Sequence, residues 1–312
     1  MRTLARPVLL VSRPAEEFLR QWPLALRGDV EGIHQARVAT RRLREALPLL
    51  RRDSRDREPA RIRAALRSLT RALGPSRELD VSRIVLAAIA TRAPSHAAAV
   101  AAADRRLALE RAATEKVLVQ IGEGIDVAAL IRRTRELAVR LAGEPGASAC
   151  ARCAGTRLRD RAHDVHVAVL GAGRVYASGP LHAVRIALKK FRYCYELAGR
   201  VAGGRHSATM RGLKRLQDIL GDMHDLQVLT AHVRDAGAAV SARQQPAMEA
   251  LAGHLDELIR DLHSRFVTER AVLVSVLARA TRLARDLAAR RPPEETVTTR
   301  PQMAAAARRR RR

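Results

Sequence analysis

Apolar residues recur every three or four positions through most of this chain, and charged residues fill the positions between them. Ile33, Ala36, Leu43, Leu47 and Leu50, for example, fall on one side of a helix drawn at about 100° per residue. No segment reads confidently as a strand, in which apolar and polar residues would alternate. The pattern therefore predicts an all-α protein.

Glycine, proline and small polar residues divide this pattern into separate helices. Gly28-Asp29 is predicted to be a turn and N-cap, Ser178 a second cap, and Pro23 an interruption of the first helix. The segment Gly143–Gly155 is rich in small residues and is predicted to be a linker. The expected helices are Glu16–Leu26, a helix from Asp29 to about Pro48, Arg61–Leu73, Ser82–Arg92, Ser95–Gln120, Val127–Leu141, Arg157–Leu170, Ser178–Gly199, Met210–Leu220, Asp225–Ala236, Pro246–Val267 and Glu269–Arg290.

One basic helix occurs twice. The sequence IHQARVATRRLR at 33–44 repeats its chemistry as LHAVRIALKKFR at 181–192, and equivalent residues lie 148 positions apart. In the first copy, His34, Arg37, Arg41 and Arg44 fall within an arc of about 80° beside the apolar stripe, and we call this row of side chains a ladder. Each copy is thus a helix with one buried stripe and a neighbouring row of cations. The equivalent pairs are His34 and His182, Arg37 and Arg185, Arg41 and Lys189, Arg42 and Lys190, and Arg44 and Arg192.

A second repeat follows each basic helix. LRSLTRALGPSRELDV at 66–81 aligns with LKRLQDILGDMHDLQV at 213–228, so that Arg67 is equivalent to Lys214. Each block predicts a helix ended by a glycine, Gly74 or Gly221, and then a polar turn. The acids that follow, Glu78 and Asp225, are expected to cap the next helix or to orient an arginine. The chain is therefore predicted to be an internal duplication, with halves at 1–145 and 146–290 and a disordered basic tail at 291–312.

The charge of the chain favours a polyanionic partner. Lysine and arginine number 58 against 32 acidic residues, which gives a net charge of +26. The tail contributes +5 of this, so the remaining 290 residues carry +21. Aromatic residues are only 2% of the chain, and single-stranded nucleic-acid binders usually stack bases on aromatic rings. Duplex DNA and inorganic polyphosphate, which are held through phosphates, remain open.

The basic rows are predicted to bind phosphate groups. Guanidinium groups hold phosphate oxygens in a bidentate fork, and lysine acts as a point charge. The ladder from His34 to Arg44 is about 15 Å long, enough to follow several phosphates of an extended chain. His34 and His182 either contact the ligand or fix the helix start. The candidate ligand-binding residues are His34, Arg37, Arg41, Arg42, Arg44, Arg67, His182, Arg185, Lys189, Lys190, Arg192 and Lys214; Arg42 and Lys190 point about 80° away from the histidines, and Arg67 and Lys214 only extend the basic surface.

Several motifs found in enzymes are present only in part. The dipeptides His163-Asp164 and His224-Asp225 are found in metal phosphohydrolases, but no further ligands complete such a site. Cys150-x-x-Cys153 with His163 and His166 has the wrong spacing for a zinc finger. No phosphate-binding G-x-x-x-x-G-K-[ST] loop is present. We therefore expect no catalytic residues, no metal and no cofactor.

The doubled motif HxxR(V/I)xx(R/K)(R/K)xR, with LGxxRxLDV and LQDxLGxxHDLxV, resembles the CHAD domain, a helical family that binds inorganic polyphosphate. The resemblance covers roughly residues 15–285. It implies two four-helix-bundle-like halves, related by a pseudo-two-fold axis around a basic central channel, and association with polyphosphate granules. Glu78 and His224 depart from the family pattern, where aspartate and asparagine or arginine are usual. The acidic signature of the CYTH domain, which often accompanies CHAD, is absent.

Two alternatives to polyphosphate binding remain at this level. One is a duplex nucleic-acid or nucleoid-binding protein, and the other is a phosphate-processing enzyme that uses His34 or His182. Three cysteines, no recognisable signal peptide and no apolar run of about 20 residues predict a cytoplasmic protein without a membrane span.

Overall fold

Every regular element that the structure describes is a helix, as the apolar period predicts. The computed structural model describes residues 7–51, 55–204 and 207–289. Two short 3₁₀ helices, η1 (Leu47–Leu50) and η2 (Pro94–His96), follow α2 and α4. The α-helices are α1 (Pro7–Leu26), α2 (Val30–Ala46), α3 (Glu58–Ala72), α4 (Gly74–Arg92), α5 (Ala97–Glu123), α6 (Val127–Arg140), α7 (Glu144–Ala172), α8 (Ser178–Val201), α9 (Ser207–Ala239), α10 (Gln245–Glu269) and α11 (Val272–Ala288).

The start of the first basic helix, α2, is set by the predicted turn and cap. Gly28 has a φ of +79°, which favours glycine, and the side chain of Asp29 accepts a hydrogen bond of 2.6 Å from the amide of Gly32. At the other end, Pro48 lies in the first turn of η1, where the α-helix gives way to a tighter 3₁₀ turn. The basic helix α2 is therefore bounded as the sequence predicts.

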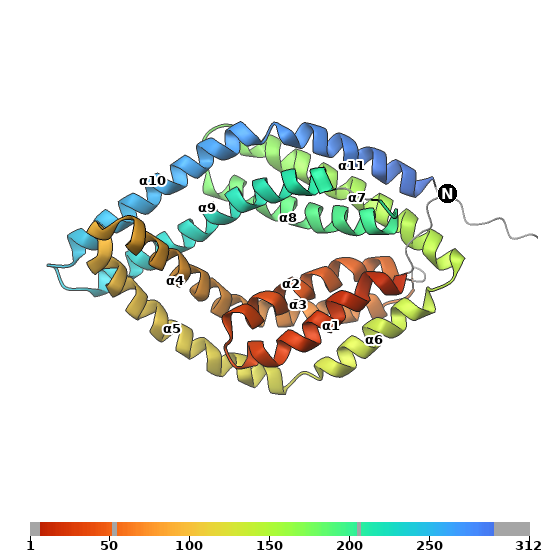
Figure 1. Ribbon diagram of the computed structural model, residues 1–312, viewed down its shortest axis with the longest axis horizontal. Helices are drawn as coiled ribbons and strands as arrows, with labels where there is room; N and C mark the ends of the chain where they lie inside the picture. The colour runs from red at the N-terminus through yellow and green to blue at the C-terminus, as the bar shows by residue number, and fades with distance from the viewer. Residues whose placement is uncertain (1–6, 52–54, 205–206, 290–312) are drawn as a thin grey trace, which may run out of the picture.

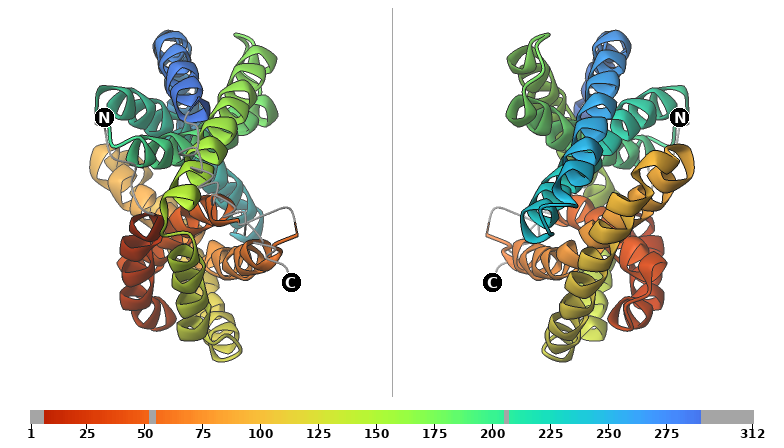
Figure 2. Two further views of the ribbon diagram at one scale, coloured as in Figure 1. Left: turned by 90° about the vertical axis from the view of Figure 1, so that its right-hand side faces the viewer. Right: turned by 90° about the vertical axis from the view of Figure 1, so that its left-hand side faces the viewer.

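The helices form two groups that meet at both ends of an elongated molecule (Figure 1). The helices α1 to α6 form one group and α7 to α11 the other, and the views in Figure 2 show the same division end-on. At one end, α4 and α5 of the first group pack against α9 and α10 of the second. At the other end, α7 packs against η1 and α2 against α8. The two basic helices, α2 and α8, thus contact each other at this end and run from there towards the middle of the molecule (Figure 1).

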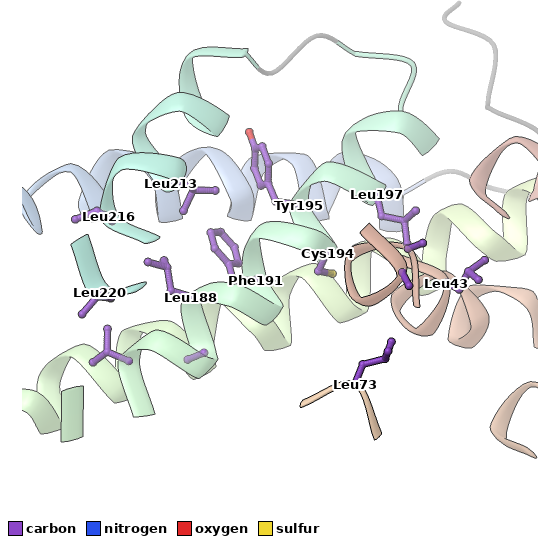
Figure 3. Packing of buried hydrophobic residues seen from close by; sticks show 14 of the residues in the cluster. Leu43, Leu73, Leu188, Phe191, Cys194, Tyr195, Leu197, Leu213, Leu216 and Leu220 are labelled. Carbon is purple, nitrogen blue, oxygen red and sulfur yellow. The ribbon is translucent and has the colours of Figure 1, made fainter. Parts of the chain in front are cut away.

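The same order of neighbours recurs in the two groups. In the first, α1 packs against α2 and α6, and α4 packs against α5; in the second, α7 packs against α8 and α11, and α9 against α10. A single cluster of buried apolar residues extends through both groups. Figure 3 shows part of it, where Leu213, Leu216 and Leu220 of α9 lie beside Phe191 and Tyr195 of α8. The halves share one core, which fixes α2 and α8 relative to each other.

The predicted linker is wrong. Residues 144–155 form the first three turns of α7, in which Cys150, Ala151 and Ala154 are buried. The small residues there allow close packing against α11: a Cβ built on Gly155 would lie 2.6 Å from the carbonyl oxygen of Ala284. The composition that indicated a linker therefore reflects a tight helix–helix contact.

Four smaller predictions about where helices begin, end or break also need correction. Gly221 does not end a helix, because α9 runs without a break from Ser207 to Ala239. Only Gly74 marks a boundary, where α3 gives way to α4, and both Glu78 and Asp225 lie inside helices instead of capping them. Ser178 is the first residue of α8 and makes no capping bond, and α1 continues through Pro23.

The predicted tail at 291–312 lies outside the described residues. Among the helices that the structure describes, none is both long enough and apolar enough to cross a bilayer.

Candidate anion-binding cavity

Side chains from both basic helices line one cavity of about 480 Å³ at the centre of the molecule. His34, Arg37 and Arg41 come from α2, and Arg185 and Lys189 come from α8. Its lining comes from α2 and α4 of the first group of helices and from α8 and α9 of the second, so the cavity lies between the two groups. Five of the twelve candidate binding residues are therefore brought together around one space.

Four further charged or ionisable residues complete the lining. Arg77 and Glu78 come from α4, and His224 and Asp225 come from α9. Arg77 and His224 were not among the predicted binding residues, although they occupy equivalent positions of the second repeat, 147 residues apart. That equivalence, next to two acids already singled out, was the signal that would have found them.

The position of Arg37 is fixed by a neighbouring helix. Its Nη1 donates a hydrogen bond of 2.7 Å to the carbonyl oxygen of Thr70, near the end of α3. Burial, followed by the nearby cations Arg41 and Arg77, lowers the pKa of Arg37 to about 10. The guanidinium remains charged at neutral pH, so it is held in a repulsive environment by a single backbone acceptor.

On the wall formed by α8 and α9, Arg185 lies close to the carboxylate of Asp225. Arg185 Nη2 lies 3.9 Å from a carboxylate oxygen of Asp225. Burial lowers the pKa of Arg185 and raises that of Asp225, in each case disfavouring the charged form. At 3.9 Å the two groups form a loose ion pair without a hydrogen bond, so the orienting role of Asp225 stays a prediction.

The cavity has an excess of positive charge. Four arginines and one lysine line it against two carboxylates, those of Glu78 and Asp225, which leaves a net charge of +3 when Lys189 is protonated and the histidines are neutral. Burial and the cations Arg41, Arg185 and Arg37 lower the pKa of Lys189 to about 7. An anion placed among these groups would relieve their mutual repulsion.

The histidines of the site are electrostatically disfavoured as cations. Burial, followed by Arg185, His182 and Lys189, lowers the pKa of His224 to about 4. Burial, followed by Arg77, lowers the pKa of His34. Neutral imidazoles can each still donate one hydrogen bond to a phosphate oxygen. His182 is exposed and lies beside the cavity lining, since its ring centroid is 5.2 Å from that of His224.

The remaining ladder residues lie away from this cavity. Arg44 lies one helical turn beyond Arg41 on α2, and its Nη1 is 3.4 Å from the hydroxyl of Thr70. Arg42 points elsewhere, with its Nη2 3.8 Å from Glu196, as its angle on the helix predicts. Arg192 lies 4.8 Å from the ring centroid of Tyr193 and is absent from the cavity lining.

The outlying lysines and Arg67 are more peripheral still. Lys190 is exposed and does not line the cavity. Lys214 pairs with Asp218 at 2.7 Å on the surface of α9. Arg67 lines a different cavity, at the end of the molecule where η1 meets α7.

The cysteines and histidines of the zinc-like motif do not come together in the fold. His163 and His166 are exposed on α7, whereas Cys150 is buried and its pKa is raised to about 12 by burial. Cys150, Cys153 and Cys194 are all free thiols. Within residues 7–51, 55–204 and 207–289, no group of three or more His, Cys, Asp or Glu side chains is placed to hold a metal ion.

Comparison with known proteins places the chain in a family. The sequence model of the CHAD domain matches residues 11–234. The chain belongs to the CHAD domain family. No curated protein matches it, and no CYTH domain is indicated.

Two solved structures share the CHAD fold with this chain. PptA from Streptomyces chartreusis is 20% identical, with a TM-score of 0.60, and the match covers 85% of this chain and 98% of PptA. The CHAD domain from the plant Ricinus communis is 22% identical, with a TM-score of 0.51, and the match covers 94% of this chain and 95% of that one. At these identities the likeness shows the fold alone.

Proposed function

We propose that this CHAD protein binds inorganic polyphosphate in the cavity between α2 and α8. The observation that carries the proposal is the convergence of Arg37, Arg41, Arg185 and Lys189, from two helices 148 residues apart in sequence, on one space with excess positive charge. The CHAD family binds polyphosphate, which supports the same ligand here.

The shape of the site favours a thin, linear polyanion over duplex DNA. Arg37 and Lys189 are partly buried within a cavity of about 480 Å³, and a double helix, whose major groove alone is roughly 12 Å wide, is too thick to enter it. A duplex would reach only the exposed cations around the opening. A polyphosphate chain carries a charge on every unit and no bases, so it needs neither a groove-sized space nor aromatic stacking partners.

The protein acts in this proposal as a binding module without turnover, by multivalent pairing of cations with successive phosphates. His34 is the ladder histidine that lines the cavity, and the carboxylates that line it with His34 lie among arginines, with Asp225 3.9 Å from Arg185. Binding of this kind would retain the protein at polyphosphate granules in the cytoplasm.

A competition experiment tests the ligand. Long-chain polyphosphate and duplex DNA are titrated against the same fluorescent polyphosphate complex at moderate salt, on a scale of phosphate units. We expect polyphosphate to displace the probe at a concentration at least about tenfold lower than DNA, a difference of about 1.4 kcal/mol. Equal displacement would favour the nucleic-acid alternative, which rests on the net charge of +26.

A variant with Arg37, Arg41, Arg185 and Lys189 replaced by alanine tests the site. The charge-matched control replaces Arg105, Arg159, Arg282 and Arg285, which are exposed and line no cavity described here. We expect the first variant to lose at least about a hundredfold in polyphosphate affinity, because charged hydrogen bonds contribute roughly 1.5–3 kcal/mol each, and the control to lose far less. Equal losses would mean that net charge alone binds the polymer. Phosphate release or labelled histidine after incubation with polyphosphate would overturn the non-enzymatic assignment.

A further inference from the structure

A second cationic cavity lies at the end of the molecule where η1, α3 and α7 meet. Its volume is about 670 Å³, larger than that of the central cavity. Its lining includes Asp56 and five arginines, namely Arg51, Arg57, Arg63, Arg67 and Arg157. An arginine-rich cavity of this size has the composition of an anion-binding site.

A row of side chains on α3 runs from this end cavity towards the basic helix α2. Arg63, Arg67 and Thr70 fall within an arc of about 60° on the helix, so they share one face. Thr70 is the residue that both Arg37 and Arg44 of the basic ladder contact, through its carbonyl oxygen at 2.7 Å and its hydroxyl at 3.4 Å. The row on α3 therefore begins where the ladder on α2 lies against it.

Arg44 occupies the position between the two cavities. It follows Arg41 by one turn on α2, and its pKa is lowered by burial, then by Arg63 and Arg67, and also by Arg41. The charge of Arg44 is therefore repelled by cations that line both cavities, Arg41 in the central one and Arg63 and Arg67 in the end cavity. The Nε–H groups of Arg44 and Arg63 are buried, and neither has an acceptor among the described residues. Two buried donors between the cavities are thus left unmatched by the described protein groups.

The acids near the end cavity are already engaged. Glu45 pairs with Arg157 at 3.0 Å, and Asp56 accepts a hydrogen bond of 3.2 Å from the amide of Glu58 at the start of α3. Among the residues that the structure describes, these two carboxylates lie near five arginines, which gives this part of the molecule an excess of positive charge. The end cavity can therefore accept further anionic groups.

We propose that a polyphosphate chain bound in the central cavity continues past Arg44 along α3 into the end cavity, so that the protein selects chains long enough to occupy both. This inference rests on the proposed function, because it assigns the length of the same ligand. The ladder from His34 to Arg44 spans about 15 Å, and Arg67 to Arg63 adds about another turn of roughly 6 Å. Tripolyphosphate would fill one cavity only.

Isothermal titration of the full chain with tripolyphosphate and with a long polyphosphate of several tens of units tests this. The variant Arg63→Ala/Arg67→Ala removes two end-cavity cations, and Arg282→Ala/Arg285→Ala removes the same charge from the exposed face of α11. We expect the first variant to bind the long polymer at least about tenfold more weakly and tripolyphosphate almost as the wild type does. The α11 variant should resemble the wild type with both ligands. A single Arg67→Glu change, at an exposed position, provides a second variant should the double variant fold poorly.

The outcomes separate this inference from the proposed function. The inference is overturned if the end-cavity variants bind the long polymer as tightly as the wild type does. If Arg185→Ala/Lys189→Ala loses tight binding in the same experiment, the proposed central site still stands. Equal loss for both ligand lengths would also overturn it. Unchanged binding in Arg185→Ala/Lys189→Ala would instead overturn the proposed central site.

Discussion

Lys189 is the residue whose ionisation state depends most on what occupies the cavity. Its pKa is about 7 because burial and three arginines disfavour the ammonium form. A bound polyanion would reverse the balance of charge around it and raise this pKa. By linkage, a group whose pKa rises on binding takes up a proton, and affinity is greatest below the pKa of the free protein. The affinity then falls as pH rises through about 7 towards the pKa of the complex.

We predict that polyphosphate binding at pH 8 takes up protons and that the affinity falls by up to roughly tenfold per pH unit above pH 7. Calorimetry in two buffers with different ionisation enthalpies measures the uptake directly. The control is Lys189→Arg, which retains the charge and titrates far above this range. It should show less uptake and a flatter pH profile. Identical uptake in the wild type and in Lys189→Arg would contradict the assignment to Lys189.

The residue scale also shows how far the sequence could predict the site. His34, Arg37, Arg41, Arg185 and Lys189 were predicted from helical spacing and repetition, and they do line one cavity. Helical spacing alone cannot predict which residues of a ladder line a cavity shared with another helix, because this depends on the angle at which the two helices cross. Arg44 and Arg192 therefore continue the periodic pattern but lie beyond the central cavity. Arg77 and His224 were missed because they follow glycines that were expected to end helices.

At the scale of whole helices, small residues had two meanings that sequence alone could not separate. Most helices of the predicted set are confirmed to within a few residues, because the apolar period continues through them. Glycine and alanine clusters, in contrast, allow either a flexible connection or a close helix contact. At Gly155 the second meaning holds, because the backbone of α11 approaches α7 there.

Gly155→Ala should therefore destabilise the fold by about 1–3 kcal/mol, since its Cβ would lie 2.6 Å from the Ala284 carbonyl oxygen and the helices would have to separate. The matched control is Gly253→Ala on α10, where nothing lies within 4 Å of the added Cβ. That change should stabilise by roughly 0.5–1 kcal/mol, since alanine favours helix. Urea unfolding measures both. A neutral Gly155→Ala would show that α7 and α11 are not in close contact.

Gly221→Ala distinguishes a continuous α9 from the two helices that the sequence predicts. Gly221 lies inside α9 and does not have a positive φ, and nothing lies within 4 Å of an added Cβ. We expect a gain of roughly 0.5–1 kcal/mol, again by urea unfolding. A loss of stability would instead indicate that Gly221 ends a helix in the left-handed conformation, which is common for helix-ending glycines.

On the scale of the whole molecule, the central cavity concentrates like charges between two groups of helices that share one core. Such repulsion opposes folding until a counter-anion is present. We predict that the variant lacking Arg37, Arg41, Arg185 and Lys189 unfolds at a higher temperature than the wild type without ligand. Polyphosphate should raise the melting temperature of the wild type, because a ligand that binds only the folded state stabilises it.

The same melting experiment on the variant is the control. Polyphosphate should shift its melting temperature little, so that the ranking of the two proteins reverses when ligand is added. A variant that is less stable than the wild type in both conditions would mean that these four side chains contribute packing that outweighs their repulsion.

The central cavity is walled by α2 near one end of the chain and by α8 well over a hundred residues later. A ribosome therefore releases the first ladder long before the opposing wall exists. A product truncated after α6 would present Arg37 and Arg41 without Arg185 and Lys189, as an open basic surface that any passing polyanion can touch. The cavity that encloses the polymer is complete only after α8 has been synthesised and the second group of helices has packed against the first.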